Sequence, residues 1–508
     1  MRFALSLPSF SVSTFGIVAL SFMGQAQAVS LQTHGQAAVV GDFVNGFPGG
    51  GSVYQGWRLP LGLTLEARPS NNLAIFYDLR LGINQYPTLA REMGNSQNFR
   101  SAAKVPFATE GGRGEHIEFV RTGFAYAEYA SGDFGLFRVG RMPRHWGLGL
   151  WRHDGGISPA SQSREWTAEG GTVSTTDGAS VLLDFRTLYF GGAWEKHSEG
   201  SPFMRGDDAE SWTVDLRVGD SLTESSQNSS GREVGIAFSR YTDGVSNTKM
   251  NILDLYSRLR YGSLFVEGEF LYPNGSTKSA QYRDMGGGAP CATNTDLADA
   301  NLMCDKQSID WVSMLFRSRY QFSSSGGQEA TLSATEAMAK RGVPTVNRRE
   351  SHSSGFWFGY AGGDAGGLEN SIGSSAVNMG VMHPNIRPSL LMFSPVANPV
   401  SGMPGAVVRN AMFARGDYTF ESPTMGSVSP SIIWATLRET AVNAVEGVGR
   451  FADLGVEGNV SYSYMTTDYL KLGGDLGLWF PGAAWAAKGS SRPSAVFGGR
   501  LSVSTIFH

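Results

Sequence analysis

The sequence predicts an all-β fold, a transmembrane antiparallel β-barrel of about 18 strands with 16 as the alternative. From Leu454 to Tyr464 the even positions are Leu, Val, Gly or Tyr, and the odd positions between them are Gly, Glu, Asn or Ser. A period of two with an apolar face and a polar face indicates a half-buried strand. Only 17% of the residues are charged, whereas Gly (66) and Phe (30) are abundant. This composition is typical of an outer-membrane barrel.

The N-terminal 28 residues have the form of a secretory signal peptide. Arg2 is their only charged residue, an apolar stretch runs from Phe15 to Phe22, and residues 26–28 (Ala-Gln-Ala) have the small-x-small form of a cleavage site. The apolar stretch is too short to span a bilayer, which disfavours an uncleaved anchor. We therefore expect a signal peptide at 1–28 and an outer-membrane barrel at 29–508. No later stretch of 18 apolar residues predicts a membrane helix.

The same alternation recurs along the chain, and a tight turn at 69–72 joins the first clear hairpin. The predicted strands are 31–43, 58–68, 73–84, 117–130, 135–145, 179–186, 188–196, 211–218, 232–241, 251–261, 264–272, 309–322, 354–361, 406–420, 429–439, 454–464, 470–480 and 497–507. Their number is even, as is required when both ends lie in the periplasm. A strand at 330–340 would make the number odd, and its Ala, Glu, Met and Lys favour a helix, so 323–353 is predicted as a periplasmic insert.

The connections alternate between short and long. We expect the short turns in the periplasm, at 69–72, 131–134, 186–188, 262–263 and 466–468. The long loops are expected outside the cell, at 85–116, 148–178, 273–308 and 362–405. Loops of this length are uncommon without a purpose, so binding, gating or surface shielding is expected there. A soluble β-solenoid would have a similar composition, but no fixed sequence period supports it.

Charged residues alternate with the apolar sets, so we expect them to face a wet lumen, because Arg or Lys facing lipid costs about 2–4 kcal/mol at mid-membrane. The predicted pore-lining residues are Arg68, Asp78, Arg80, Arg258, Arg260, Glu267, Glu269, Arg317, Arg319, Arg415, Asp417, Glu457, Asp475 and Arg500. Each could line a pore or belong to a structural salt-bridge ladder, and the sequence favours neither. Both signs are present, so no clear ion selectivity is predicted.

One predicted strand, 135–145, contains Arg141 and Arg144 near its end, and Trp146 follows it. These three residues are candidates for the extracellular mouth or a constriction. Capping of the barrel rim is an equally good interpretation. Cys291 and Cys304 are expected to form a disulfide in the oxidising compartment, with two free thiols as the alternative.

No motif predicts an enzyme, a metal site or a cofactor. Residues 219–222 (Gly-Asp-Ser-Leu) match a block of lipase-like hydrolases, but no partner Asp-x-x-His follows near the C-terminus. His145, His153 and Asp154 leave a strand close together and favour loop structure over metal binding. The net charge of −4 and the pI near 6 argue against a nucleic-acid partner.

Several ordered blocks carry a resemblance to a poorly characterised family of Gram-negative outer-membrane barrels. They are residues 140–150 (GRMPRHWGLGL), 359–364 (GYAGGD) and 383–393 (HPNIRPSLLMF). Residues 454–457 and 480–482 are similar to blocks shared more distantly with alginate-export-type barrels. Asn385 and Ile386 depart from the acid and aromatic usual in that family, and the final His508 follows the usual terminal aromatic. The resemblance implies the porin-like fold and carries little about activity.

Three functions remain open from the sequence. The leading hypothesis is a porin-like outer-membrane channel for passive diffusion of small polar solutes, because about 18 strands leave an aqueous lumen. The alternatives are an exopolysaccharide export conduit and a plugged barrel that acts as a surface binding or structural protein. The expected partners are outer-membrane lipid with lipopolysaccharide, the barrel-insertion machinery and a small polar solute.

Overall fold

A computed structural model describes most of the strands and several segments between them. The described residues are 29–45, 54–85, 121–132, 134–152, 175–198, 209–219, 232–244, 247–277, 307–323, 350–362, 376–377, 382, 386, 388–393, 408, 410–422, 424–438, 453–467, 470–485 and 494–507. Within these ranges no helix is long and apolar enough to cross a membrane. The predicted signal peptide, both cysteines, the insert 323–353 over most of its length and most of the long loops lie outside the described residues.

The described strands form one sheet. Those of the barrel wall are β1 (Ser30–Asn45), β2 (Tyr54–Ser70), β3 (Leu73–Gln85), β4 (Arg121–Ala130), β5 (Gly135–Pro143), β6 (Thr175–Asp184), β7 (Leu188–Ser198), β8 (Ala209–Gly219), β9 (Glu233–Asp243), β10 (Thr248–Tyr261), β11 (Leu264–Thr277), β13 (Ser313–Ser323), β14 (Ser351–Ala361), β16 (Ala411–Ser422), β17 (Gly426–Leu437), β18 (Asp453–Met465), β19 (Leu470–Pro481) and β20 (Val496–Phe507). Two short strands, β12 (Gln307–Asp310) and β15 (Ala376–Val377), and the single 3-10 turn η1 (Ala483–Trp485) complete the described elements.

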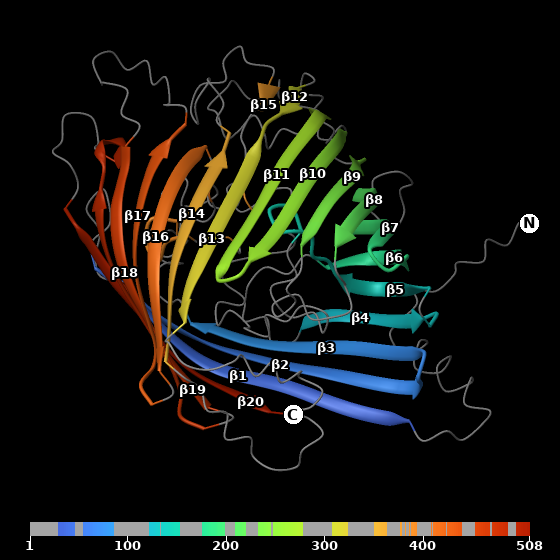
Figure 1. The fold of residues 1–508 in the computed structure, drawn as a ribbon, viewed down its shortest axis with the longest axis horizontal. Helices are drawn as coiled ribbons and strands as arrows, with labels where there is room; N and C mark the ends of the chain where they lie inside the picture. Colours follow the sequence, from blue (N-terminus) through green and yellow to red (C-terminus); the bar gives the residue numbers. More distant parts are fainter. Residues whose placement is uncertain are drawn as a thin grey trace, which may run out of the picture.

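The wall is a closed antiparallel barrel of 18 strands. Each wall strand pairs with the next wall strand along the chain, and β20 pairs with β1 over the register Gly35↔Phe507 to Asn45↔Phe497. Figure 1 shows this order as a continuous change of colour around the ring, with red β20 beside blue β1. Closure leaves no unpaired sheet edge in the wall. The predicted fold class and strand number are therefore confirmed.

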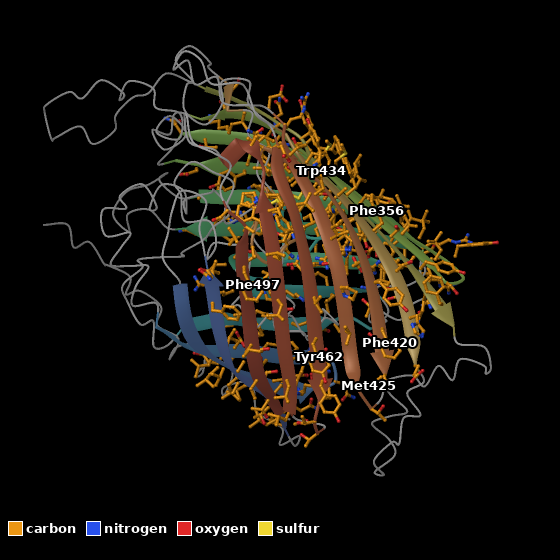
Figure 2. The ribbon with its side chains drawn as sticks, turned by 90° about the vertical axis from the view of Figure 1, so that its left-hand side faces the viewer. Phe356, Phe420, Met425, Trp434, Tyr462 and Phe497 are labelled. Atoms are coloured by element: carbon orange, nitrogen blue, oxygen red, sulfur yellow. The ribbon has the colours of Figure 1, made fainter. Side chains whose placement is uncertain are left out.

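The period of two determines which side chains face outward. Along β9 the apolar side chains of Val234, Ile236 and Phe238 are 43–55% exposed, whereas Ala237 and Ser239, at the alternate positions, are buried. The outward set of the other strands is also largely apolar. Figure 2 shows labelled members spread over the outer wall from β14 to β20, namely Phe356, Phe420, Met425, Trp434, Tyr462 and Phe497.

The predicted strand 309–322 corresponds to β12 and β13. Both pair with β11 in one continuous register, from Asn274↔Asp310 to Leu271↔Ser313, with Trp311 and Val312 between them. The Trp311 N–H donates to the Pro273 carbonyl oxygen at 3.4 Å, and the alternation of buried and exposed residues continues through this position. Trp311 is only 8% exposed and belongs to the main apolar cluster of the lumen.

Short connections lie together at one end of the barrel. Gly262 and Ser263 alone join β10 to β11, and Gly262 has φ +57°, which a two-residue hairpin turn requires. Residues 71–72 and 185–187 are equally tight connections at the same end, since every second connection returns there. The short turns predicted at 69–72, 186–188 and 262–263 therefore share one end, as expected, whereas the four-residue connection 244–247 between β9 and β10 lies at the opposite end with the long loops.

Candidate functional site

A row of charged and aromatic side chains crosses the inner wall. The strand registers place Arg258 opposite Glu267, Glu267 opposite Arg317, Arg317 opposite Trp357, and Trp357 opposite Arg415. Residues directly opposite one another on neighbouring strands share a face and lie within contact distance. These five side chains therefore form one continuous row on β10, β11, β13, β14 and β16.

Ion pairs and ring contacts hold this row together. The Glu267 carboxylate is 3% exposed and accepts hydrogen bonds from Arg258 Nε at 2.9 Å and from Arg317 Nη2 at 2.7 Å. The guanidinium groups of Arg317 and Arg415 each lie 5.1 Å from the centroid of the Trp357 ring. Such cation–π contacts align both arginines along the wall without neutralising their charge.

Acidic partners balance the row. Asp417 Oδ2 lies 3.7 Å from Arg415 Nε, and Glu233 Oε2 lies 3.9 Å from Arg258 Nη1. On β8, which pairs with the β9 strand that carries Glu233, Arg217 Nε donates to Asp215 at 3.1 Å. The lumen wall therefore presents both signs of charge side by side.

Residues 144–152, here the first inward segment, continue from the end of β5 into the lumen. The ends of this segment meet at the Glu195 carboxylate of β7, which is fully buried and pairs with both Arg144 and Arg152. Ser211 Oγ donates to the same carboxylate at 3.0 Å. Two arginines on one buried carboxylate form a closed clasp at the base of the segment.

The tip of the first inward segment is attached to β11. The Glu269 carboxylate accepts hydrogen bonds from the backbone N–H of Leu148 and, at 3.0 Å, from that of Leu150. Trp146 lies over Gly235, where an added Cβ would come within 2.9 Å of the indole ring. The Arg217 guanidinium lies 4.6 Å from the centroid of that ring. A glycine is needed here because any larger side chain would occupy the space of the indole.

Residues 388–393, here the second inward segment, approach the opposite part of the wall. The Glu457 carboxylate of β18 is fully buried and accepts three backbone hydrogen bonds, from the N–H groups of Leu390 (2.8 Å), Leu391 (2.9 Å) and Met392 (2.7 Å). Arg415 Nη1 donates to the carbonyl oxygen of Pro388 at 2.9 Å. Three converging N–H groups form a concavity that suits an anion, and a wall carboxylate occupies it.

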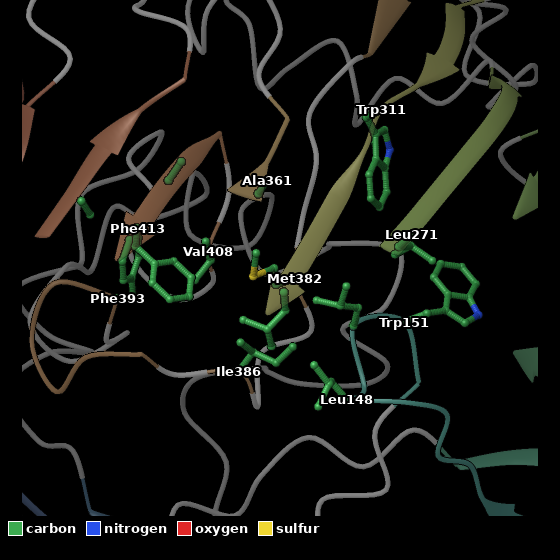
Figure 3. Close-up of a cluster of buried hydrophobic side chains, with 14 of the residues drawn as sticks. Leu148, Trp151, Leu271, Trp311, Ala361, Met382, Ile386, Phe393, Val408 and Phe413 are labelled. Atoms are coloured by element: carbon green, nitrogen blue, oxygen red, sulfur yellow. The ribbon is translucent and has the colours of Figure 1, made fainter. Parts of the chain in front are cut away.

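The two inward segments join one buried apolar cluster. Leu148, Leu150 and Trp151 of the first segment and Leu391, Met392 and Phe393 of the second belong to it, together with Met382, Ile386 and Val408. Figure 3 shows Met382, Ile386 and Leu148 between Trp151 and Leu271 on one side and Phe393 and Phe413 on the other. The wall members of the cluster, such as Leu271, Phe413, Trp479 and Val496, lie at the strand ends next to the long loops. Both segments therefore narrow the lumen at that end.

Most predicted pore-lining residues share the inner face with these groups. By alternation along their strands, the inner set includes Arg68, Asp78, Arg258, Arg260, Glu267, Glu269, Arg317, Arg319, Arg415, Asp417, Glu457, Asp475 and Arg500. The backbone of Arg80 lies in β3, and its side chain is outside the described part of the chain. Glu269 and Glu457 hold the inward segments and are not open wall charges.

The structure places the three mouth candidates on different faces of the barrel wall. Arg144 and Trp146 lie inside the barrel, in the first inward segment. Arg141 instead shares the outer face with Val139, which is 50% exposed, and pairs with Asp177 of β6 at 3.0 Å. The alternation Val139–Arg141 already carried this information, because the apolar residue two positions away is on the outer face. Arg141 is therefore not part of a lumen constriction.

Several inner residues had no signal strong enough to single them out. Glu195 belongs to the inward set of β7 by alternation, but only the fold shows that Arg144 and Arg152 reach it. Trp357 carries no sequence signal that sets it among charged side chains, and the register is needed to place it between two arginines. Their partners are distant in sequence.

A serine, a histidine and a glutamate also meet near the clasp. His197 Nε2 lies 2.8 Å from Ser211 Oγ, and the serine donates to Glu195. In a catalytic triad the acid orients the histidine, whereas here Glu195 accepts from the serine and pairs with two arginines. This arrangement is a structural network. Within the described ranges no group of three or more His, Cys, Asp or Glu side chains could hold a metal ion.

Comparison with known proteins identifies no family for this chain. No protein-family model matches the chain, and no curated protein matches it. Similar solved structures include Pseudomonas aeruginosa OccK8 (OprE), at 10% identity, with 94% of this chain and 98% of that chain covered and a TM-score of 0.45. Two others are P. aeruginosa OccK2 (OpdF) in complex with glucuronate, at 11% identity, 94% and 98% coverage and TM-score 0.45, and P. aeruginosa OpdK with vanillate, at 10%, 94%, 98% and 0.44. At these values the likeness carries no argument about function, and the pairing of the chain's own strands establishes the barrel.

Proposed function

We propose that this chain is an outer-membrane channel for the passive diffusion of small polar solutes. The observation that carries the proposal is a closed 18-strand wall with an apolar outer face and a charged inner face. A barrel of this strand number is wide enough for an aqueous lumen. Arg317 and Arg415 of the inner face remain partly exposed, which a dry core would disfavour.

The outer face fits a bilayer. On β8 four successive outward positions, Trp212, Val214, Leu216 and Val218, are 40–60% exposed. Exposed apolar surface that continues around a whole barrel exceeds what a water-soluble protein presents. Outward charges such as Arg240 and Lys249 lie beyond the apolar positions, toward the end with the long loops. This gives a band with polar boundaries, as a membrane barrel requires.

The inner wall favours polar solutes of either sign. The row from Arg258 to Arg415 exposes part of its charge, since the Arg317 side chain is 33% exposed and that of Arg415 is 21% exposed. Each of these arginines lies near a carboxylate, so a passing solute meets paired donors and acceptors. Such a wall orients polar molecules and does not reject one sign of charge.

We assign the selection of solutes by size to the two inward segments. They bring bulky apolar side chains into the end of the lumen near the long loops, and Arg415 of the charged row contacts the second segment. We place the long loops outside the cell, and we propose that residues 1–28 direct export and that the C-terminal strand is read by the barrel-insertion machinery.

One observation favours a second function. The apolar cluster formed by the inward segments would suit a plugged barrel whose long loops bind a partner at the cell surface. The export conduit that the alginate-export-like blocks suggested is less favoured, because a polyanion needs a wide lumen with one sign of charge.

The test is the single-channel conductance of purified, refolded protein in a planar bilayer, with folding checked by the shift in electrophoretic mobility on heating. We expect steady conductance steps and a cation-to-anion permeability ratio close to one. Folded protein that inserts and conducts nothing would refute the channel and favour the plugged barrel. A strong preference for one sign of ion would refute the assignment of the balanced wall as the solute path.

A further inference from the structure

We propose that the outer faces of β8 to β11, which lie side by side in the wall (Figure 1), bind one molecule of the lipid A part of lipopolysaccharide. An apolar groove at mid-height of the wall accommodates an acyl chain, and Arg240 and Lys249 bind a phosphate of the head group. The inference rests on the proposed place of the barrel in an outer membrane, with its long loops outside the cell. It assigns a partner to the outside of the wall, whereas the proposed channel concerns the lumen.

The groove is a depression in the apolar outer face. It has a volume of about 590 Å³ and is bordered by large outward side chains such as Ile236, Phe270 and Phe316. Its floor consists of Ser257 and Gly268, which lie directly opposite each other on β10 and β11. Two small residues between large neighbours lower the surface of the wall. The volume falls within the range of about 300–1,000 Å³ that is typical of ligand pockets.

The groove is open and suits hydrocarbon. A Cβ added at Gly268 would have its nearest heavy atom, Ser257 Oγ, at 3.8 Å, so the floor has room for additional atoms. Water does not fill an apolar depression of this kind, because it would find too few hydrogen-bond partners there. In a bilayer, a hydrocarbon chain fills the groove instead.

Two positive charges lie on the same outer face, toward the end with the long loops. Lys249 of β10 is opposite Thr242 of β9, so it is a diagonal neighbour of Arg240, at a distance of about 7–8 Å. Both side chains are exposed, and neither pairs with a carboxylate among the described residues. The outward acid of β8, Glu210, accepts a hydrogen bond from Trp194 Nε1 at 3.4 Å. Two cations at this spacing can bind one phosphate from two sides.

The charges and the groove are one leaflet apart. Trp212, opposite Arg240, is 60% exposed, as is typical of a tryptophan at the level of the lipid head groups. Arg240 and Val234 are six residues apart on β9, which corresponds to about 20 Å along the strand. A strand tilt of about 35–45° reduces this to about 15 Å across the membrane, half of the hydrocarbon core of about 30 Å. Val234 is opposite Ser257 of the groove floor, so a chain whose head group lies at Arg240 reaches the groove.

One molecule therefore has to supply both the phosphate and the chain. The charges lie at the long-loop end, which is next to the outer leaflet, and lipid A is the phosphorylated lipid of that leaflet. A second copy of the chain fits this face less well. A twofold axis along the membrane normal would bring the same residues of both copies to the same height, so Arg240 and Lys249 would face their own copies and repel them.

The first test removes the charges. Native mass spectrometry of the folded full-length chain in detergent, titrated with diphosphoryl lipid A, should show one retained lipid. Arg240→Gln with Lys249→Gln should lower the affinity about 25-fold, since each basic side chain beside an anionic lipid contributes about fivefold. Arg232→Gln is the matched control, because Arg232 precedes β9 at the end with the short turns. Equal affinity of the parent chain and the double variant would overturn the proposal.

The second test fills the groove. Gly268→Val adds methyl groups to the floor without a steric clash, and valine is favoured in strands. The affinity for lipid A should fall at least about fourfold, which corresponds to one displaced methylene group. Gly416→Val on the outer face of β16 is the matched control, since no atom lies within 4 Å of an added Cβ there. Unchanged affinity in folded Gly268→Val would refute the groove as the chain site.

Two further measurements identify the occupant and separate this inference from the channel. Dephosphorylated lipid A should bind the parent chain as weakly as diphosphoryl lipid A binds the double variant, and equal binding of both lipids by the parent would overturn the phosphate assignment. A dimer without bound lipid would overturn the proposal in favour of a second copy. If the parent chain retains lipid A and conducts nothing, the channel is refuted and the lipid site stands. If it conducts and retains no lipid A, the lipid site is refuted and the channel stands.

Discussion

The clasp at Glu195 provides the sharpest test of the electrostatic argument. In Glu195→Ala the two arginines remain in place, with side-chain exposures of only 17% for Arg144 and 10% for Arg152. Ser211 and Thr176, whose hydroxyls lie 3.0 Å and 3.3 Å from the carboxylate, also lose their partner. Removing one partner of a buried ion pair costs about 3–5 kcal/mol, because the remaining charge is left uncompensated.

The assay is an equilibrium urea titration of the barrel refolded into lipid vesicles, which gives the free energy of unfolding. We expect Glu195→Ala to lower it by about 3–5 kcal/mol, and we expect the triple variant that also carries Arg144→Met and Arg152→Met to recover most of the loss. Glu210→Ala is the matched control, since Glu210 bonds the exposed Trp194 on the outer face, and it should change stability by less than about 0.5 kcal/mol. A loss below about 1 kcal/mol for Glu195→Ala would show that water screens the clasp, and the argument would fail.

Three further predictions concern other parts of the barrel. Leu255→Arg on the outer face of β10 should reduce the free energy of unfolding in vesicles by about 2–4 kcal/mol. Asn251→Arg, on the same face nearer the strand end, should reduce it by about 0–1 kcal/mol. Equal losses would mean that the apolar band is misplaced. Gly235→Val should force the Trp146 ring from its seat and cost about 1–3 kcal/mol in the same urea titration, and no loss would show that the ring does not lie there. Trp357→Leu should release both flanking arginines, cost about 1–3 kcal/mol and alter the reversal potential in a salt gradient, while an unchanged potential would exclude the row from the ion path.

Alternation made the wall predictable from the sequence. A strand between lipid and water must place apolar residues at every second position, so the pattern from Leu454 to Tyr464 recurs in each wall strand. The same rule assigned Arg258, Glu267 and Arg317 to one face, and the register then shows that they are neighbours. By the same alternation Trp311 faces inward, and the structure places it in the apolar cluster of the lumen.

The inward segments were beyond sequence reasoning. The block at 140–150 stood out through a family resemblance and as a candidate constriction at Arg144 and Trp146, and that at 383–393 through the resemblance alone. Nothing local indicates that both enter the lumen. Their attachment depends on single carboxylates such as Glu269 and Glu457, which read in sequence like any other inner charge. A hydrogen bond between a wall side chain and a distant backbone has no periodic signature, so only the three-dimensional register reveals it.

The pairing of β1 with β20 has a consequence for the order of assembly. The first and last wall strands are neighbours, so the ring cannot close before β20 has been synthesised. Until then one free edge of β1 and one of the newest strand are open to pairing with other chains, which exposes the nascent protein to aggregation. The adjacency also implies that a circular permutant, with these two strands linked and new ends placed at Gly262–Ser263, would keep every ladder and lose only one tight turn. Such a permutant would begin and end in the middle of the present chain. Its folding would show whether the same ring of strands forms when the strands are synthesised in a different order.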